Sequence, residues 1–398
     1  MNPVVIAGAG PAGCTLALYL AEHNIPVILL ESGRVLPEDL RASTFHPPSL
    51  DMLDELGIVD DMMAVGLKVD DYQYRDRRTN EIARFKLDIL GGETRHPYRL
   101  QCEQFKMTKI IVEKLKSFPH AEVRFSNRVK GFQEIDGGVQ VLVHTESGEE
   151  HVKASYLVGC DGANSVVRQA GGVLFEGMTY PERFLVASTT YKFDDYFEGL
   201  SLVNYVSDPE EWCVLLKTKD LWRVLVPTPL DEMEDKFLSD EFIQERLHRL
   251  AENDKDFDIV HRTLYRVHQR VAETYQVRDR VLIAGDAAHV NNPLGGMGMN
   301  GGLHDTINLA QKLVKITKHG GDRQSLLALY NRQRRGICTQ FIQNHTMKNK
   351  ALMEATDETI QRERQARFMK YSADDKLAKD FLMETSMINC VRESYEIA

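Results

Sequence analysis

The feature that most constrains this fold is the loop Gly8-Ala9-Gly10-Pro11-Ala12-Gly13. An apolar run at residues 3–7 precedes it, a stretch with helical apolar spacing follows at 11–23, and a second apolar run occupies 26–30. Short apolar runs of this kind are typical of strands buried on both faces of a parallel sheet. The sequence therefore predicts a strand–helix–strand unit with the glycines at its first turn.

The glycines of this loop favour dinucleotide binding. Gly8 permits the tight turn, Gly10 lets a pyrophosphate approach the backbone, and Gly13 allows the helix to pack closely, while the start of the helix presents unpaired amides to the phosphates. Glu31 ends the second strand, where a carboxylate can accept the hydroxyl hydrogens of a ribose. The same G-x-G-x-x-G spacing recurs at residues 296–301, but no strand that ends in an acidic residue follows it. A nicotinamide donor would therefore have no Rossmann domain of its own.

Length and charge narrow the class of protein. The 398 residues suit two domains, or one large domain with an additional segment that extends from it. The 49 Lys+Arg against 59 Asp+Glu give a net charge of -10, which argues against a nucleic-acid partner and favours small molecules. The chain has neither a basic leader nor an apolar stretch of about 18 residues, so we expect a cytoplasmic protein without a membrane segment. The scattered cysteines favour reduced thiols and no metal site.

The rest of the chain alternates between strand and helix patterns. Residues 72–87 predict an antiparallel hairpin, 121–158 a meander of strands, and 183–228 further strands. A fully apolar strand at 281–284 enters a second glycine-rich loop, and 303–352 predicts a long helical stretch. The mixed charges at 361–367 are typical of a solvated helix face. We expect this segment to form capping helices or an oligomer contact, and the protein to be a monomer or a homodimer.

Two further motifs follow the first loop in order. The second is Asp161-Gly162-Ala163-Asn164-Ser165-Val166-Val167-Arg168, and the third runs from Gly285-Asp286-Ala287-Ala288-His289 through Pro293, Gly295, Gly298 and Asn300 to Asp305 and Asn308-Leu309. With these motifs the sequence resembles the single-component flavoprotein aromatic hydroxylases, the family of p-hydroxybenzoate hydroxylase, over roughly residues 3–340. Phe45-His46-Pro47-Pro48 and the segment 208–212 look most like the p-nitrophenol-type and hydroxypyridine-type members.

The resemblance implies an α/β fold with a Rossmann-like FAD-binding domain, an inserted, mostly antiparallel β-sheet domain for the substrate, and C-terminal helices. The FAD-binding domain would be discontinuous, because its motifs are far apart in the sequence. We expect it to comprise residues 1–70, 100–180 and 268–340, the substrate domain to comprise 71–99 and 181–267, and the helical segment to span 341–398.

The resemblance also implies which residues bind FAD. Asp286 would hydrogen-bond a ribityl hydroxyl, and Arg41 would bind the pyrophosphate unless it forms a surface ion pair. Asp161 would contact the diphosphate and the donor, or instead cap the helix that starts near Asn164. If Asn300 begins a helix, its amide and that of the next residue can face the N1–C2=O edge of the flavin. The full expected set is Gly8, Gly10, Ala12, Gly13, Glu31, Arg41, Gln101, Asp161, Asp286, Pro293, Gly298, Met299 and Asn300.

The activity that the resemblance implies is that of an FAD-dependent aromatic monooxygenase. NADH or NADPH would reduce FAD, O2 would add at flavin C4a, and the hydroperoxide would transfer its terminal oxygen to an electron-rich phenol or hydroxypyridine, with or without displacement of a ring substituent. Two alternatives stay open: an FAD-dependent reductase of the related prenyl-reductase type, and a non-catalytic FAD-binding module. A halogenase is disfavoured because the chain lacks a W-x-W-x-I-P run.

The sequence identifies no catalytic base. His46, His289 and Pro293 are the catalytic candidates, although a histidine in a cofactor-binding turn is more often a packed structural residue. The substrate-binding candidates are Tyr205, Trp212 and Trp222, which a strand can equally bury in its core. The basic stretch 261–280 either holds an anionic substrate or donor phosphate, or is a surface strand.

Overall fold

The computed structural model describes residues 1–398 except for 39, 41, 209–210, 230–232 and 356. The predicted strand–helix–strand unit is present as β1 (Val4–Ala7), α1 (Pro11–Glu22) and β2 (Val27–Leu30). These strands belong to a five-stranded parallel sheet of order β18-β12-β1-β2-β8, which β8 (Ala121–Arg124), β12 (Tyr156–Gly159) and β18 (Val281–Ile283) complete. All residues of β1, β2 and β12 are buried, as expected for strands covered on both faces.

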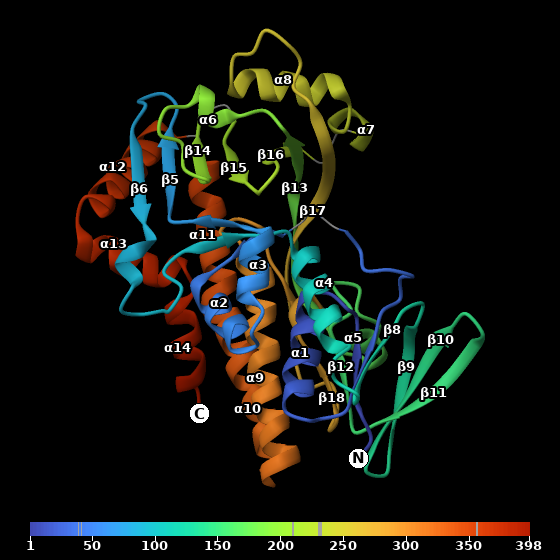
Figure 1. The fold of residues 1–398 in the computed structure, drawn as a ribbon. Coiled ribbons are helices and arrows are strands. Elements are labelled where there is room, and N and C mark those ends of the chain that lie inside the picture. The colour runs from blue at the N-terminus through green and yellow to red at the C-terminus, as the bar shows by residue number, and fades with distance from the viewer. Residues whose placement is uncertain (39, 41, 209–210, 230–232, 356) are drawn as a thin grey trace.

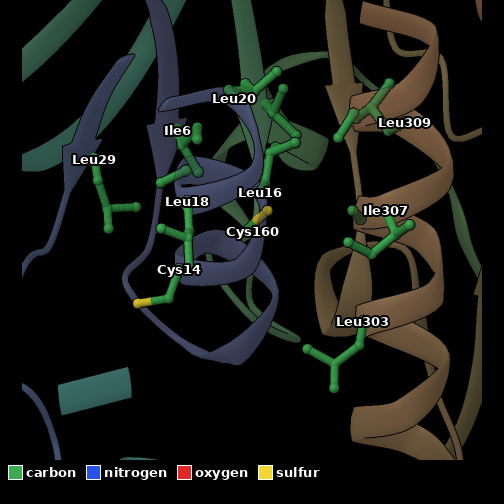
Figure 2. Packing of buried hydrophobic residues seen from close by; sticks show 14 of the residues in the cluster. Ile6, Cys14, Leu16, Leu18, Leu20, Leu29, Cys160, Leu303, Ile307 and Leu309 are labelled. Atoms are coloured by element: carbon green, nitrogen blue, oxygen red, sulfur yellow. The ribbon is translucent and has the colours of Figure 1, made fainter. Parts of the chain in front are cut away.

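Helix α1 is packed between this sheet and the long helix α9 (Met297–His319), as Figure 2 shows. Leu16 and Leu20 of α1 and Leu303 and Ile307 of α9 are at most 2% exposed and belong to one core cluster. The close approach depends on glycine, because a Cβ at Gly302 of α9 would lie 3.0 Å from the Cα of Gly285. This layer holds the carboxyl ends of β1, β12 and β18 in fixed positions.

The predicted meander forms an antiparallel sheet of β9 (Arg128–Ile135), β10 (Gly138–Thr145) and β11 (Gly148–Ala154). The two ends of the predicted stretch, β8 and β12, instead belong to the parallel sheet. The β12 run is apolar and fully buried, whereas β11 is mostly exposed, so burial separates the two sheets.

The second large layer is an eight-stranded sheet of order β19-β17-β13-β16-β15-β14-β5-β6, in which only the β14–β5 pair is parallel. The predicted hairpin is present as β5 and β6, with Asp71 opposite Lys86. The fold class is therefore confirmed: a parallel α/β layer joined to a mostly antiparallel sheet and followed by C-terminal helices. The strands are β5 (Asp71–Asp76), β6 (Ile82–Lys86), β13 (Phe175–Thr189), β14 (Val203–Ser207), β15 (Cys213–Lys217), β16 (Trp222–Pro229), β17 (Ile259–Ala272) and β19 (His289–Val290).

The expected domain boundaries at 180/181 and 267/268 fall inside β13 and β17, which pair on both sides of a register shift between Thr179 and Arg183, as far as Phe175 opposite Ala272. The division into domains stays a proposal. A small antiparallel sheet of β3 (Thr44–Phe45), β7 (Arg99–Gln101) and β4 (Leu67–Val69) completes the strands.

The predicted helical stretch 303–352 is divided into several segments. Helix α9 ends at His319 and is capped by Gly320, whose φ of 65° a residue with a side chain rarely adopts. It is followed by α10 (Arg323–Ile337), a π-helical segment (Cys338–Gln343) and α11 (Asn344–Glu354). The other helices are α2 (Pro47–Glu55), α3 (Val59–Val65), α4 (Gln104–Leu115), α5 (Val166–Ala170), α6 (Phe193–Tyr196), α7 (Glu234–Phe237), α8 (Asp240–Leu250), α12 (Glu358–Ser372), α13 (Asp375–Thr385) and α14 (Ile388–Glu396).

Helix α12 differs from the expected solvated helix. Gln361, Arg364 and Gln365 are each at most 3% exposed, on the same face as Phe368, which stacks on Tyr74 of β5 at 4.0 Å. Figure 1 shows α12 and α13 beside β5 and β6. Hydrogen bonds to the turn between β5 and β6 satisfy the two buried glutamines: Gln361 accepts from Arg78 (2.8 Å), and Gln365 donates to the carbonyl of Glu81 (3.2 Å). Within the described ranges, no helix combines the length and apolarity needed to cross a membrane.

Candidate cofactor and substrate site

The three sequence motifs meet at one edge of the parallel sheet. Strands β1, β12 and β18 are neighbours and run in the same direction, so Gly8, Asp161 and Gly285, which follow them, come together at their carboxyl ends. This is the edge where open α/β sheets bind ligands. A cavity of about 410 Å³ lies here and extends to the eight-stranded sheet.

The cavity has two parts. We call the cofactor end the part lined by Gly10, Pro11, Ala12, Gly162, Ala163, Gly285 and Asp286, and the sheet end the part lined by Val186, Val203, Tyr205, Val214, Leu216, Arg223 and Leu225. The loop 293–296 and the start of α9 also contribute to its wall, through Pro293, Leu294, Gly295, Gly296, Gly298 and Met299.

The first loop fits a pyrophosphate. Gly8 has a φ of 98°, and a Cβ on it would lie 2.5 Å from the carbonyl oxygen of Cys160. A Cβ on Gly13 would lie 2.0 Å from the carbonyl oxygen of Gly8. Gly10 differs: no atom lies within 4 Å of the place its Cβ would take, and the residue lines the cavity. The open space over Gly10, at the start of α1, is thus large enough for a phosphate to reach the backbone.

Glu31 lies at the carboxyl end of β2, as expected. Its two oxygens accept from the amides of Ala9 (3.0 Å) and Gly33 (2.8 Å), so it also fixes the glycine loop. A carboxylate retains further acceptor positions after two such bonds. Its contact with a ribose stays a prediction.

The carboxylate of Asp161 caps helix α5. It accepts from Ser165 Oγ (2.5 Å) and from the amides of Val166 (2.7 Å) and Val167 (3.2 Å). The geometry therefore favours the capping alternative for this side chain, while Gly162 and Ala163 line the cavity. Arg41 lies outside the described residues.

The third motif presents Asp286 and the start of α9 to the cavity. Asp286 has an exposed side chain and lines the cofactor end. Helix α9 begins at Met297, after Gly296 in the left-handed conformation, so the condition that Asn300 begins the helix is not met. The first amides of a helix have no acceptor within it, and of these first residues Gly298 and Met299 line the cavity. This helix end would stabilise negative charge on a reduced flavin ring.

Two expected cofactor residues lie behind the cavity wall. Asn300 is buried; its side-chain oxygen accepts from the amide of His46 (2.9 Å), and its nitrogen donates to the carbonyl of Thr44 (2.9 Å). Gln101 is also buried and exchanges hydrogen bonds with Thr44 (2.9 Å from its nitrogen). Asn300 connects the segment of β3 to the start of α9, and Gln101 connects β7 to β3. Neither lines the cavity, so contact with FAD stays a prediction for them.

His46 is a packed residue rather than a group exposed to a ligand. It is fully buried, and its Nε2 donates to the carbonyl of Gly295 (2.8 Å). Burial, together with the nearby Arg99, lowers the pKa of His46 well below its ordinary value, so the ring is neutral at pH 7. His46 thus holds the loop that contains the third catalytic candidate, Pro293, which does line the cavity.

His289 belongs to a buried charge network. Its Nε2 donates to Asp305 Oδ2 (2.9 Å), and the same oxygen accepts from the amide of Gly285 (3.2 Å). The second oxygen of this carboxylate, Oδ1, accepts from Arg334 Nε (2.8 Å). Burial opposes protonation of His289, but Cys338 and Asp305 raise its pKa well above its ordinary value. His289 does not line the cavity, and the network fixes the turn that presents Asp286.

The three aromatic candidates separate. Tyr205 lines the cavity, but Trp222 and Trp212 do not. Trp222 faces a separate core cluster and donates to Asp194 (2.6 Å), because strand residues alternate and Arg223 and Leu225 occupy the cavity face of β16. Trp212 lines a second hollow, near Arg246.

Several cavity residues were absent from the expected set. The buried Arg99 and Arg223 both line the cavity, as do Tyr265, Arg266 and His268 of β17. The last three come from the basic stretch noted in the sequence, whereas Arg99 has no local signal, because nothing in a three-residue strand indicates which face meets a cavity. Burial, with Arg270 and Arg266, lowers the pKa of His268.

Comparison with known proteins agrees with this geometry. The FAD binding domain family matches residues 1–345. A para-nitrophenol 4-monooxygenase of Pseudomonas sp. (strain WBC-3) is 32% identical over 98% of this chain and 96% of its own. A 6-hydroxy-3-succinoylpyridine 3-monooxygenase of Pseudomonas putida is 34% identical over 83% of this chain and 84% of its own.

A solved structure shows the same similarity. The p-nitrophenol 4-monooxygenase PnpA from Pseudomonas putida DLL-E4 superposes with a TM-score of 0.92 at 31% identity, covering 98% of each chain. The motifs, the glycine-lined cavity and these similarities agree. The chain therefore belongs to the FAD binding domain family, among the single-component flavoprotein aromatic hydroxylases.

Proposed function

We propose that the protein is an NAD(P)H-dependent, FAD-containing monooxygenase that hydroxylates a phenol or hydroxypyridine. The observation that carries this proposal is a single cavity that joins a glycine-lined cofactor end to a mostly apolar sheet end. FAD, when bound there, supplies O2 activation and transfer of one oxygen atom to the ring. The names of the relatives support nitrophenols and hydroxypyridines as the substrate class.

The chain itself positions the reactants and excludes water. Gly10 and the start of α1 bind the pyrophosphate, Asp286 binds the ribityl chain, and the first amides of α9 face the flavin ring. Val203, Val214 and the other apolar side chains of the sheet end surround the aromatic substrate. Substitution of water by these walls protects the reactive oxygen from side reactions.

The test is substrate-stimulated donor oxidation by the purified yellow protein. NADH and NADPH are offered in turn with a series of phenols and hydroxypyridines under labelled O2. We expect faster donor oxidation with an active aromatic, and one labelled oxygen atom in the product. Donor oxidation that proceeds without O2 to a reduced organic product would instead support a reductase. A protein that binds FAD but oxidises neither donor with any aromatic would support a non-catalytic module.

A further inference from the structure

Arg99 is a buried cation that lies outside the three cofactor motifs. It lies in β7, is 2% exposed and lines the cavity. Its guanidinium carbon lies 4.1 Å from the centroid of the Tyr72 ring, and its Nε has no hydrogen-bond partner. Within the described part of the chain, no carboxylate forms an ion pair with it.

The groups around Arg99 do not neutralise it. Burial raises the pKa of Tyr72 to about 12, and the hydroxyl of Tyr72 is hydrogen-bonded to Thr385 Oγ1 (3.0 Å), so the ring carries no charge at pH 7. His46 and Tyr74 also lie near Arg99, and both are neutral at pH 7, because burial lowers the pKa of His46 and raises the pKa of Tyr74. Among the described residues that line the cavity, Asp286 is the only carboxylate, and it lies at the cofactor end.

Arg99 lies beside the sheet end. Tyr72 contacts Tyr205 edge-on, with ring centroids 6.3 Å apart, and Tyr205 lines the same cavity. The other buried arginine of the wall, Arg223, differs because it donates to Ser43 Oγ (3.2 Å) and to the carbonyl of Leu40. A buried cation without a counter-charge is costly, and an anionic ligand in the cavity would remove that cost.

We propose that Arg99 is the anion-binding residue of the sheet end and pairs with a negatively charged oxygen of the aromatic substrate, either a phenolate or an aryl carboxylate. The inference rests on the proposed function, and it adds that the substrate enters as an anion. A planar guanidinium suits both groups, since it can donate two parallel hydrogen bonds. Arg99 thus selects charged over neutral aromatics of the same shape.

The test measures binding to the oxidised holoprotein by calorimetry, without donor, so that no turnover occurs. The carboxylate arm compares 4-hydroxybenzoate with 4-hydroxybenzamide. The phenolate arm compares 4-nitrophenol with 4-nitroanisole, which cannot ionise, at pH values below and above the phenol's pKa. We expect the charged member of at least one pair to bind about 10- to 100-fold more tightly. In the phenolate arm this preference should develop as the pH rises.

Three variants connect the preference to Arg99. In Arg99→Gln we expect the charged and neutral members to bind equally, in Arg99→Lys a partial preference, and in the control Arg128→Gln, an exposed arginine of β9, the wild-type result. If the wild-type protein binds the charged and the neutral compound equally in both pairs, the inference is overturned, even if the variants do not fold. A preference that persists in Arg99→Gln would also overturn it. Charge-selective binding without hydroxylation would instead contradict the proposed function alone.

Discussion

At the residue scale, glycines of the first loop have different tasks although they share a motif. Gly13 is required by packing, because a side chain there would overlap the carbonyl of Gly8, whereas Gly10 faces open space in the cavity. The backbone of Gly10 has a φ of -73°, which any residue can adopt. The sequence motif alone does not separate these two reasons.

We therefore expect Gly10→Ala to affect FAD binding and Gly13→Ala to affect the stability of the fold. Gly10→Ala should keep the melting temperature of the FAD-free protein and weaken FAD binding, because its methyl group occupies the space of the phosphate. Gly13→Ala should lower the free energy of unfolding by about 1–3 kcal/mol, since the helix must move. Thermal melting of the apoprotein and FAD titration measure the two effects. Equal loss of stability in both variants would contradict the assignment.

Asp286→Ala should lose FAD affinity while the fold is largely kept. The side chain lines the cavity and is exposed, so its removal takes away a cofactor contact without leaving a hole in the core. Loss of one hydrogen bond to a charged group corresponds to about 1.5–3 kcal/mol, or roughly 10- to 100-fold in the dissociation constant. Asp279→Ala, which removes only a surface ion pair with Arg323, is the matched control. Unchanged FAD retention in Asp286→Ala would count against the third motif.

Burial of the neutral His46 ring should make the free energy of unfolding depend on pH. Its pKa is lower in the folded protein than its ordinary value of 6.5, so the unfolded chain binds more protons as the pH falls below 6.5. Folding stability should then decrease by up to about 1.4 kcal/mol per pH unit from this group. His46→Gln, which can still donate to Gly295, should show a smaller decrease between pH 7 and 5 in urea unfolding. The exposed His144→Gln should behave as wild type.

At the element scale, the buried face of α12 shows how tertiary contacts override composition. The segment contains more charged than apolar residues, yet Gln361, Arg364, Gln365 and Phe368 repeat at helical spacing and meet the β5–β6 hairpin. Phe368 and Phe381 of α13 lie against Tyr74 and Phe85. The C-terminal helices therefore support the strands that carry Tyr72, and through it Arg99.

Removal of one ring from this contact should be costly. Phe368→Ala should lower the free energy of unfolding by about 3–5 kcal/mol, because the side chain is 4% exposed and stacks on Tyr74. Ile360→Ala on the same helix is the control, since Ile360 is 49% exposed and should cost less than about 1 kcal/mol. Chemical denaturation of both variants checks the difference. A similar cost in both would indicate that α12 contributes through its helix alone.

At the scale of the whole molecule, the chain passes repeatedly between the two large sheets. Strand β18 belongs to the parallel sheet, whereas β19, six residues further on, pairs with β17 of the eight-stranded sheet. Figure 1 shows both layers beside α9. The cofactor end and the sheet end of the cavity are therefore built by segments that alternate along the chain, so neither layer is a continuous piece of sequence.

This topology predicts cooperative unfolding of the two layers. Both tryptophans, Trp212 and Trp222, lie in or beside the eight-stranded sheet, whereas FAD would report on the parallel sheet. We expect tryptophan fluorescence and FAD release to show the same midpoint in urea, because a layer cannot unfold without removing segments of the other. Separate midpoints would show that the layers unfold independently.

The sequence by itself determined the features that depend on local chemistry. Glycines at a tight turn, apolar runs buried on two faces and three motifs in a fixed order predicted the parallel sheet, the FAD site and the family, because each depends on neighbouring residues. Only the tertiary structure decided which side chains meet the cavity. Alternation along a strand defines two faces but not which of them is the inner one, so the sequence could neither place Trp222 in a separate core cluster nor place Arg99 in the cavity wall. A buried charge such as that of Asp305 finds its partner, Arg334, 29 residues away in the sequence, and only the packing of the helices brings the two together.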